Sequence, residues 1–295
     1  MSAALASTVV LETVDYYTIN GGNVYGLALD ATKAFDRVEY TKLFQCLLDR
    51  GVRPMFIRLL LRMYVGQKLR VKFNQSNSQF FNVCNGVKQG GVLSPTLFSI
   101  YVNGLLDKLK MSGYGCYVGR VFIGAVGYAD DLILLAPTQF ALHQMIKICE
   151  QYAKEFNIAF NGSKSKLIVF GENCEQINVS VKVNGAEVER VSKLNYLGIY
   201  VHQDRCNSMV QDVLKDFNIK VNSFLGDFGC TSSALKNTLF DKYCMSLYGS
   251  QNCMLYNRDI SKLFISWRKA IRRIWRLPFR AHNRLLPLIS YLVPY

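Results

Sequence analysis

Two apolar runs in this chain carry carboxylates at points where buried strands would end. Asp30 follows the run Val24–Leu29, and Asp130 and Asp131 interrupt the run Val126–Leu135 where a tight turn between two strands is expected. A carboxylate beside buried apolar strands is costly unless it binds something positive or reaches solvent. Any fold of this chain must therefore bury both runs while leaving their acidic ends accessible.

Length and charge narrow the class of protein. With 295 residues, 50% of them hydrophobic, the chain can bury a substantial core in one or two domains. Thirty-five Lys and Arg against 21 Asp and Glu leave a formal charge of +14, which favours an anionic partner, nucleic acid or a membrane surface. A basic surface without such a partner stays open on charge alone.

The cysteines and the chain's apolar runs favour an intracellular location. None of the nine cysteines forms a CxxC pair, so neither a disulfide framework nor a zinc knuckle is indicated. We find no secretory leader and no apolar run of the roughly 18 residues that a membrane span needs. The sequence predicts a reduced, intracellular, soluble protein of the cytoplasm or nucleus.

Hydrophobic periodicity predicts helices mixed with strands up to about residue 205 and helices beyond it. This gives two expected domains, 1–205 and 206–295. Asn184-Gly185 is the strongest hairpin signal. Helices are expected over 1–20, 40–48, 56–64, 95–109 and 138–152. Strands are expected at 24–29, 69–73, 80–83, 167–170, 179–183, 188–191 and 194–201, with two more in 121–136.

The Asp130-Asp131 pair points to metal chemistry. Adjacent carboxylates repel each other when ionised, and a divalent cation relieves that repulsion. Magnesium is usually held by a few carboxylates together with substrate phosphates. Two such ions can activate an attacking hydroxyl and stabilise the leaving oxygen in phosphoryl transfer. The alternative for the pair alone is a solvated turn, in which Asp is common.

The order of these motifs resembles a known family. Tyr128-Ala-Asp-Asp131 resembles motif C of reverse transcriptases, and Leu27–Asp36 resembles their motif A. The resemblance extends over roughly residues 20–201 and is to the enzymes of non-LTR (LINE-type) retrotransposons. It implies an α+β right-hand polymerase palm, an antiparallel sheet backed by helices, with partial fingers and a helical thumb-like C-terminal region. It also implies that Asp30, Asp130 and Asp131 hold two Mg²⁺ ions.

Two further segments would shape the nucleotide site. Gly86–Phe98 resembles motif B, which implies that Gln89 and Gly90 lie at the pocket for the incoming nucleotide. Phe35 falls where the family places a bulky side chain that excludes a ribose 2′-hydroxyl. The alternatives are a simple loop-to-helix turn for the first segment and an ordinary core phenylalanine for Phe35.

Two downstream segments complete the resemblance. Asn161–Phe170 looks like motif D, which implies that Lys164 lies near the pyrophosphate leaving group. Leu194–Gly198 resembles the primer-grip hairpin, which implies primer contacts for Tyr196, Leu197 and Gly198. The alternatives are a solvated loop lysine and ordinary strand core.

The segment from Arg258 to Arg284 is strongly basic, with nine Lys and Arg residues and one Asp. Its apolar residues recur at helical spacing, which predicts an amphipathic basic helix suited to phosphate backbones. A helix of this kind could instead lie on an anionic membrane. The cations that fall mainly on the polar side, and are expected to bind nucleic acid, are Lys269, Arg272, Arg273 and Arg276.

The chain departs from the family at both ends. Few finger strands can precede Asp30, and neither an endonuclease domain nor a zinc knuckle is recognisable, so the chain looks like part of a longer polyprotein. The function expected from the resemblance is RNA-directed DNA synthesis from an RNA template, a DNA primer and deoxynucleoside triphosphates. The alternatives are a catalytically inactive nucleic-acid-binding remnant and a decayed product that barely folds.

Overall fold

The computed structural model describes residues 2–172, 174–203, 208–228, 231, 233–245 and 258–290. Contacts divide the chain into two compact units, Met1–Ser192 and Lys193–Tyr295, and each is described by itself. The boundary predicted near residue 205 lies outside the described residues. The hairpin of β14 (Lys193–Tyr196) and β15 (Ile199–His202) falls in the second unit, because β15 packs against α6 (Ser208–Phe228).

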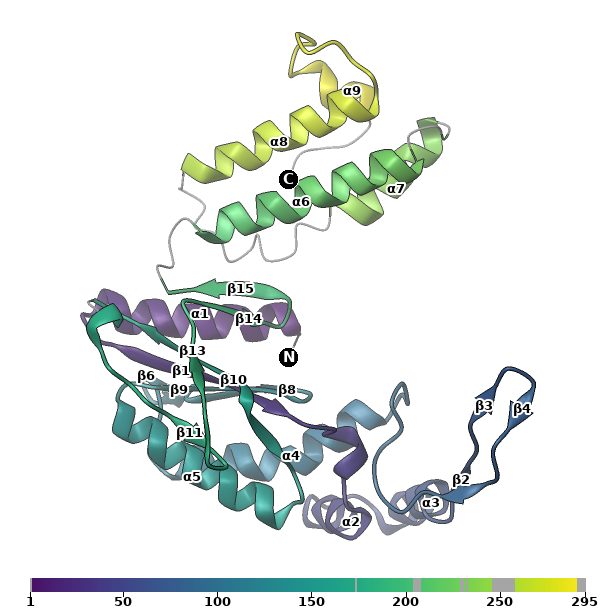
Figure 1. The fold of residues 1–295 in the computed structure, drawn as a ribbon, viewed down its shortest axis with the longest axis vertical. Helices are drawn as coiled ribbons and strands as arrows, with labels where there is room; N and C mark the ends of the chain where they lie inside the picture. Colours follow the sequence, from purple (N-terminus) through teal and green to yellow (C-terminus); the bar gives the residue numbers. More distant parts are fainter. Residues whose placement is uncertain are drawn as a thin grey trace. The chain divides into compact units, whose positions relative to one another are not determined.

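The N-terminal unit is built on a five-stranded sheet in the order β13-β10-β1-β9-β8 (Figure 1). β1 is the middle strand and pairs antiparallel with both β9 and β10, while the short β13 adds to β10 in parallel. The strands are β1 (Val24–Ala31), β8 (Ala125–Tyr128), β9 (Asp131–Ala136), β10 (Phe160–Phe170) and β13 (Glu189–Arg190). The predicted antiparallel sheet is thus confirmed, with one parallel edge pairing.

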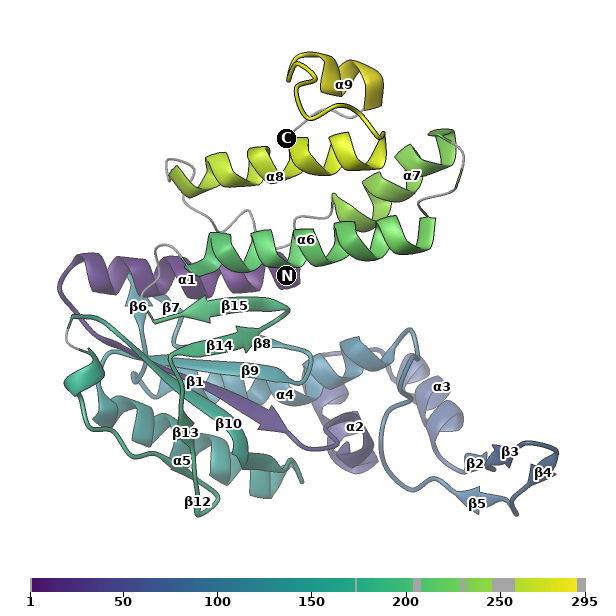
Figure 2. The same cartoon turned by 45° about the horizontal axis from the view of Figure 1, so that its top comes forward.

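Helices cover both faces of this sheet (Figures 1 and 2). α4 (Ser94–Met111) and α5 (Gln139–Glu155) pack on one face, and α1 (Ala3–Ile19) packs on the other. Successive side chains of a strand point to opposite faces, and Leu27 and Leu29 of β1 are buried in the core on the α4–α5 side. The predicted fold of a sheet backed by helices is confirmed.

The segment between β1 and α4 contains short helices followed by an extended ribbon that projects away from the sheet (Figures 1 and 2). It contains the 3₁₀ turn η1 (Phe35–Arg37), α2 (Tyr40–Asp49) and α3 (Pro54–Tyr64). The ribbon pairs β2 (Lys68–Leu69) with β5 (Phe81–Asn82) and β3 (Lys72–Phe73) with β4 (Ser76–Asn77). The hairpin expected from the runs 69–73 and 80–83 is therefore present.

Three smaller features complete the N-terminal unit. β6 (Tyr117–Val118) pairs with β7 (Val121–Phe122), and η2 (Cys174–Gln176) is a single turn. β11 (Lys182–Val183) pairs with β12 (Ala186–Glu187). The turn joining them uses Asn184 and Gly185 with φ of 50° and 79°, as the Asn-Gly signal predicts.

Several predicted strands are shorter in the structure, and two predictions differ from it most in extent. β10 begins at Phe160 rather than near 167, because its first half is polar and gives no apolar signal. The single strand predicted over 194–201 is the β14–β15 hairpin, because Leu197 and Gly198 adopt left-handed φ values of 50° and 78° and reverse the chain. The hairpin form implied by the primer-grip resemblance describes this segment better than its hydrophobicity does.

The C-terminal unit is helical beyond its hairpin in the part that the structure describes. α6 packs on both α7 (Ser233–Cys244) and α8 (Arg258–Ile274), and α9 (Leu285–Ser290) contacts α8. Trp267, Ile271 and Ile274 of α8 are buried in the shared core, which confirms the predicted amphipathic helix. No helix within the described ranges combines the length and apolar character needed to cross a membrane.

Candidate active site

The pairing of β1 with β9 brings the two predicted carboxylate sites together. Leu29 pairs with Leu132 in an antiparallel register, and continuing that register by one residue sets Asp30 opposite Asp131. Residues directly opposite on antiparallel strands point to the same face of the sheet. Two carboxylates that are about a hundred residues apart in the sequence therefore lie side by side at the end of the central strand.

Asp130 lies in the tight turn that joins β8 to β9. Tyr128 pairs with Asp131 to close this turn, and Ala129 and Asp130 form its tip. Ala129 has a φ of 52°, a left-handed conformation that residues other than Gly, Asn and Asp rarely adopt. The side chains of Asp130 and Asp131 are both exposed, so solvent or a ligand can reach them.

Asp131 lies within the electrostatic influence of Asp130 and Asp30. Partial burial raises the pKa of the Asp131 carboxyl above its ordinary value, and the negative charges of Asp130 and then Asp30 raise it further. Within the described ranges, no group of three or more His, Cys, Asp or Glu residues could hold a metal ion by itself. Magnesium in nucleotide-binding sites usually takes one or two protein carboxylates and completes its shell with water and phosphate. The carboxylates of Asp30, Asp130 and Asp131 fit a site of this kind, in which the protein supplies some of the metal ligands and the substrate supplies others.

A bulge in β10 holds Asp30 from the other side. Ala28 pairs with Lys166 and Asp30 pairs with Asn161, so the residues between them on β10 leave the ladder. The backbone N–H of Asp30 donates to Oγ of Ser165 at 3.2 Å, and that hydroxyl donates to the carbonyl oxygen of Asn161 at 2.7 Å. Ser165 is 1% exposed, so these two hydrogen bonds join β1 to β10 inside the protein; we call this arrangement the Ser165 clamp.

Lys164 lies in this bulge with its side chain exposed. Its backbone N–H donates to Oδ1 of Asn161 at 3.3 Å, and the hydroxyl of Ser163 donates to the same oxygen at 2.7 Å. Gly162 is buried where a Cβ would come within 2.6 Å of the Val183 carbonyl oxygen, so the β11–β12 hairpin requires glycine there. Lys164 thus extends from a fixed bulge that begins just after Asn161, the residue paired with Asp30.

The segments that resemble motifs A and B are tied together by their backbones. Val87 donates its N–H to the carbonyl oxygen of Phe35, and Gly86 donates to that of Val38, both at 2.8 Å. Gly86 has a φ of 94°, and a Cβ there would lie 3.0 Å from the Cα of Asp36. Only glycine suits this crossing of the two loops.

Gln89 and Gly90 lie in the exposed turn that precedes α4. The side-chain amide of Gln89 donates to Oδ1 of Asp36 at 3.4 Å, which keeps this turn near the segment after Asp30. Gly90 has a φ of 77° and open space around its Cα, so its conformation is set by backbone geometry rather than by a close neighbour. Ser94, at the start of α4, is buried and its hydroxyl has no partner.

Phe35 is half-buried between the end of β1 and α4. Its ring stacks on that of Phe98, with centroids 4.9 Å apart and an interplanar angle of 26°. It also packs against the main core, as the alternative interpretation of an ordinary core phenylalanine predicts. The residue is nevertheless only partly buried.

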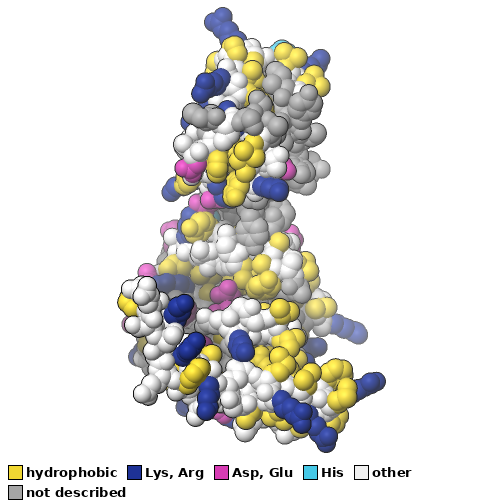
Figure 3. Space-filling model, turned by 90° about the vertical axis from the view of Figure 1, so that its right-hand side faces the viewer, with side chains coloured by type: hydrophobic (Ala, Val, Ile, Leu, Met, Phe, Trp, Pro, Cys, Tyr) yellow, Lys and Arg dark blue, Asp and Glu magenta, His cyan; other side chains and the backbone are white. Residues whose placement is uncertain are grey.

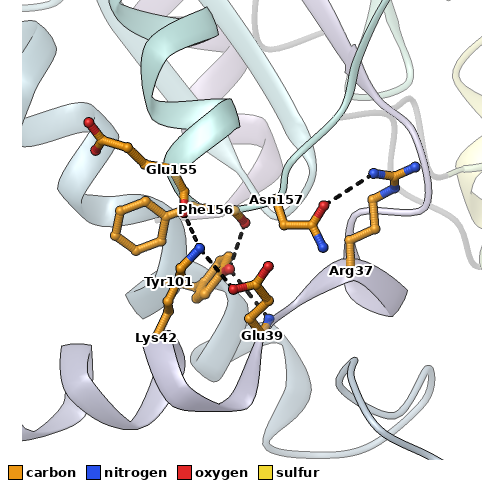
Figure 4. Close-up of polar contacts among 7 residues, drawn as sticks. All are labelled: Arg37, Glu39, Lys42, Tyr101, Glu155, Phe156 and Asn157. Carbon is orange, nitrogen blue, oxygen red and sulfur yellow. Dashed lines mark hydrogen bonds and ion pairs between the residues drawn. The ribbon is translucent and has the colours of Figure 1, made fainter.

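A polar network joins the segment after Phe35 to the middle of α4 and to the C-terminal end of α5 (Figure 4). Tyr101 of α4 accepts from the N–H of Glu39 at 3.4 Å and donates to the Phe156 carbonyl oxygen at 2.6 Å. Burial raises the pKa of Tyr101 to about 12, so it stays protonated and able to donate. Lys42 pairs with Glu39 at 2.8 Å and also donates to the Glu155 carbonyl oxygen.

The hairpin that resembles the primer grip belongs to the C-terminal unit. Tyr196 is 3% exposed, whereas Leu197 and Gly198 form the turn. Asp212 of α6 anchors the other end of the hairpin, accepting from Lys193 at 2.7 Å and from His202 at 2.5 Å. Burial acts to raise the pKa of Asp212, but the hydrogen bonds and charges of Lys193 and His202 outweigh it and lower the pKa.

The four cations predicted to bind nucleic acid line one open pocket at the end of α8. The pocket has a volume of about 460 Å³ and also includes Leu277 and Phe279. Arg272 donates to the Ala281 carbonyl oxygen at 2.9 Å and to Asn283 Oδ1 at 2.7 Å, so it also holds the chain after α8. Arg273 donates to Oδ1 of Asn222 of α6 at 2.9 Å, while Lys269 and Arg276 have exposed side chains.

Sequence reasoning missed the residues that hold this site in place. Ser165, Gly86 and Tyr101 act through hydrogen bonds or close approaches to residues far away in the sequence. Gly86 begins the segment that resembles motif B, so a glycine requirement could have been proposed there. Ser165 and Tyr101 carry no local signal, because their partners are set only by the folded sheet and helices.

Comparison with known proteins bears on what this site does. A family model described as reverse transcriptase (RNA-dependent DNA polymerase) matches residues 3–201, about two thirds of the chain. The chain belongs to the reverse transcriptase family. The match includes all the residues from Asp30 to Gly198 that resemble the family's motifs.

Curated relatives confirm the resemblance to non-LTR retrotransposon proteins. The chain is 28% identical over 179 residues to the retrovirus-related Pol polyprotein from type-2 retrotransposable element R2DM of Drosophila melanogaster, covering 58% of the chain and 17% of that protein. It is also 28% identical over 180 residues to the RNA-directed DNA polymerase from mobile element jockey of Drosophila funebris, covering 58% and 19%. The chain therefore spans less than a fifth of the length of these relatives.

A solved structure supports the fold. The chain resembles telomerase from Candida albicans, solved in complex with a fragment of telomeric RNA, with a TM-score of 0.53 and 13% identity. The likeness covers the whole chain and 53% of the telomerase chain. At this identity the similarity supports a shared polymerase palm fold and supports no statement about function.

Proposed function

We propose that this reverse transcriptase domain synthesises DNA on an RNA template from a DNA primer and deoxynucleoside triphosphates. The observation that carries the proposal is the register of β1 and β9, which sets Asp30 opposite Asp131 and beside the turn that holds Asp130. The raised pKa of Asp131 supports it, because three mutually repelling carboxylates are suited to binding cations. Membership of the reverse transcriptase family supports RNA-directed DNA synthesis as the reaction.

In this proposal Asp30, Asp130 and Asp131 hold two Mg²⁺ ions together with the triphosphate. When bound, such ions lower the pKa of the attacking hydroxyl and stabilise charge on the leaving oxygen. The protein's share is to hold the carboxylates in place, through the strand register on one side and the Ser165 clamp on the other. Lys164, exposed on the bulge next to Asp30, neutralises or protonates the departing pyrophosphate.

The neighbouring loops would receive the nucleotide. Phe35, fixed from one side by Phe98, excludes a ribose 2′-hydroxyl and so favours deoxyribonucleotides. Gln89 and Gly90 contact the incoming nucleotide or the templating base, since their turn is exposed and tied to the segment after Asp30. An exposed glycine lets a ligand approach the backbone closely.

The C-terminal unit would hold the nucleic acid. Tyr196, Leu197 and Gly198 form the tight turn expected of a primer grip. Lys269, Arg272, Arg273 and Arg276 bind phosphates through the pocket that they line. Because Arg272 already makes two internal hydrogen bonds, most of the phosphate contact falls to Lys269, Arg273 and Arg276.

The experiment is extension of a labelled DNA primer on an RNA template with Mg²⁺ and the four deoxynucleotides. We expect extension by the chain and its loss in Asp130→Ala and Asp131→Ala, with Asp107→Ala of α4 as an exposed-carboxylate control that keeps activity. Failure to extend by folded chain that binds the primer–template would contradict the proposal and favour an inactive nucleic-acid-binding remnant.

A further inference from the structure

The stretch that runs from the end of α2 into α4 has an unusual charge distribution. From Arg50 to Leu106 the sequence contains no Asp or Glu at all, and it contains eight Lys and Arg residues. This stretch carries more than half of the chain's formal charge of +14 on less than a fifth of its length. The eight cations are Arg50, Arg53, Arg58, Arg62, Lys68, Arg70, Lys72 and Lys88.

These cations are available to a ligand. All eight have exposed side chains, and none forms an ion pair within the ranges that the structure describes. A run of unpaired like charges on an ordered surface raises the local potential and attracts polyanions. The distribution points to phosphates, since no acidic side chain in this stretch compensates the charge.

The β2–β5 ribbon adds aromatic groups to the charge. Lys68, Arg70 and Lys72 alternate along the chain with apolar residues, and Phe73 at the tip is 76% exposed. Phe80, just before β5, is 62% exposed, with the Arg70 guanidinium 5.3 Å from its ring centroid. Leu69, Val71 and Phe81 of the same ribbon are also exposed, so the apolar side chains gather in one place among cations, and a grouped apolar surface with a polar rim is typical of an interaction site.

The ribbon lies apart from the carboxylate site. It projects from α3, away from the five-stranded sheet, in both views of the fold (Figures 1 and 2). Figure 3 views the molecule from the side to which the ribbon projects, and Lys and Arg side chains are interspersed there with hydrophobic ones over the N-terminal unit. The ribbon is therefore a separate surface rather than a wall of the site around Asp30.

We propose that the β2–β5 ribbon binds single-stranded nucleic acid, with Lys68, Arg70 and Lys72 on the phosphates and Phe73 and Phe80 stacked against bases. Single strands suit this surface better than duplex, because unpaired bases present faces on which aromatic rings can stack. Charge complementarity selects nucleic acid over an apolar protein segment as the occupant. The proposal does not rest on the polymerase function, because binding of this kind needs no catalysis.

The test measures binding with the metal removed, so that it cannot be confused with catalysis. A fluorescent single-stranded RNA is titrated with the chain in EDTA at several salt concentrations. The triple variant Lys68→Gln, Arg70→Gln, Lys72→Gln is compared with Lys110→Gln, Lys147→Gln, Lys154→Gln. The control set removes the same charge from exposed lysines of α4 and α5.

We expect the ribbon variant to bind roughly tenfold to hundredfold more weakly than the control, with a salt dependence of log K reduced by about 2 for three lost phosphate contacts. Phe73→Ala should weaken single-strand binding about tenfold, while leaving duplex binding unchanged. Each substituted side chain is exposed, so unfolding curves should match those of the unchanged chain.

Two outcomes would overturn the proposal. Equal affinity and equal salt slope in the ribbon and control variants would show that Lys68, Arg70 and Lys72 do not contact nucleic acid. Undiminished single-strand binding in Phe73→Ala would remove the stacking part and leave a nonspecific charge effect. Primer extension is measured separately, and its loss or retention decides neither outcome.

Discussion

The backbone N–H of Asp30 donates a hydrogen bond to the buried hydroxyl of Ser165, 3.2 Å away across the β1–β10 pairing. Ser165 in turn donates to the Asn161 carbonyl oxygen, so a single hydroxyl closes the bulge and fixes the end of the central strand. The carboxylate site is therefore held by a residue that has no charge and no direct part in the chemistry.

Replacing Ser165 with alanine should leave the Asp30 N–H without its partner. We expect Ser165→Ala to lower the free energy of unfolding by about 1–3 kcal/mol, the usual cost of an unsatisfied buried polar group. Chemical denaturation measures it, and Ser163→Ala, which alters the exposed hydroxyl of the same bulge, should change it by less than about 0.5 kcal/mol. Equal effects of the two changes would argue against a clamp at Ser165.

Gly86 and Gly90, two of the three glycines between β5 and α4, should respond differently to a methyl group. Gly90→Ala adds only left-handed strain, about 1–2 kcal/mol, since nothing lies within 4 Å of the new Cβ. Gly86→Ala adds the same strain and pushes Cβ to 3.0 Å from the Asp36 Cα, so it should cost at least about 1 kcal/mol more. Thermal or denaturant unfolding of both variants checks the difference, and an equal cost would contradict the close crossing of the two loops.

Phe35 combines a packing role with the proposed exclusion of ribose. We expect Phe35→Ala to reduce the preference for deoxyribonucleotides over ribonucleotides about tenfold or more. It should also destabilise the fold by about 2–4 kcal/mol through lost packing on Phe98. Phe98→Leu removes the stacking partner while keeping Phe35, so it serves as the control. If both variants lose the same preference, Phe35 acts through packing alone.

The raised pKa of Asp131 has a consequence for stability without metal. A carboxyl whose folded pKa exceeds its unfolded value loses stability as pH rises from about 3.8 through the folded value. Asp131→Asn should therefore be more stable than the unchanged chain at neutral pH in EDTA, by at most about 1 kcal/mol because solvent screens these charges. Mg²⁺ should stabilise the unchanged chain more than the variant.

Unfolding curves at pH 3.5 and pH 7, with EDTA and with Mg²⁺, measure both effects. Asp107→Asn, which neutralises an exposed carboxylate of α4, should show neither of them. A lower stability of Asp131→Asn at neutral pH without metal would mean that Asp131 is favourably paired, against the repulsion inferred from its raised pKa.

Asp212 should show the opposite pH dependence. Its pKa is lowered in the folded chain, so its contribution is present above about 3.8 and is lost as pH falls through the folded value. Asp212→Asn should cost about 1 kcal/mol at pH 7, and the difference should vanish in acid. Asp216→Asn is the control, because its ion pair with Lys220 is largely exposed. A pH-independent cost at Asp212 would rule out the charge as its origin.

The sequence predicted the parts of this fold that have strong local patterns. The apolar runs gave β1 and the β8–β9 hairpin, helical spacing gave α2 to α5, and Asn184-Gly185 gave the β11–β12 turn. These signals lie within single segments of the chain. The pairing of β1 with β9 was implied by the family resemblance rather than by any property of the two strands.

Other features depend on distant partners and left no local signal. The first half of β10 is polar and contains the bulge between Asn161 and Lys166. It can be recognised as a strand only from its pairing with β1. The sequence places Arg272 among the cations on the polar side of α8. In the fold it donates a hydrogen bond to the carbonyl oxygen of Ala281, nine residues further along the chain. Side-chain clamps of this kind can be identified only after the fold is known.

The strand register brings Asp30 and Asp131 together beside the turn that holds Asp130, and we propose that divalent cations bind among these three carboxylates. The most direct test replaces Mg²⁺ with Fe²⁺ in the presence of primer–template and a deoxynucleotide, and generates hydroxyl radicals with ascorbate and peroxide. We predict backbone cleavage near residue 30 and near residues 130–131, suppressed by excess Mg²⁺ and absent from the Asp130→Asn, Asp131→Asn double variant. Cleavage at only one of these positions, or cleavage that the double variant retains, would contradict a shared metal site.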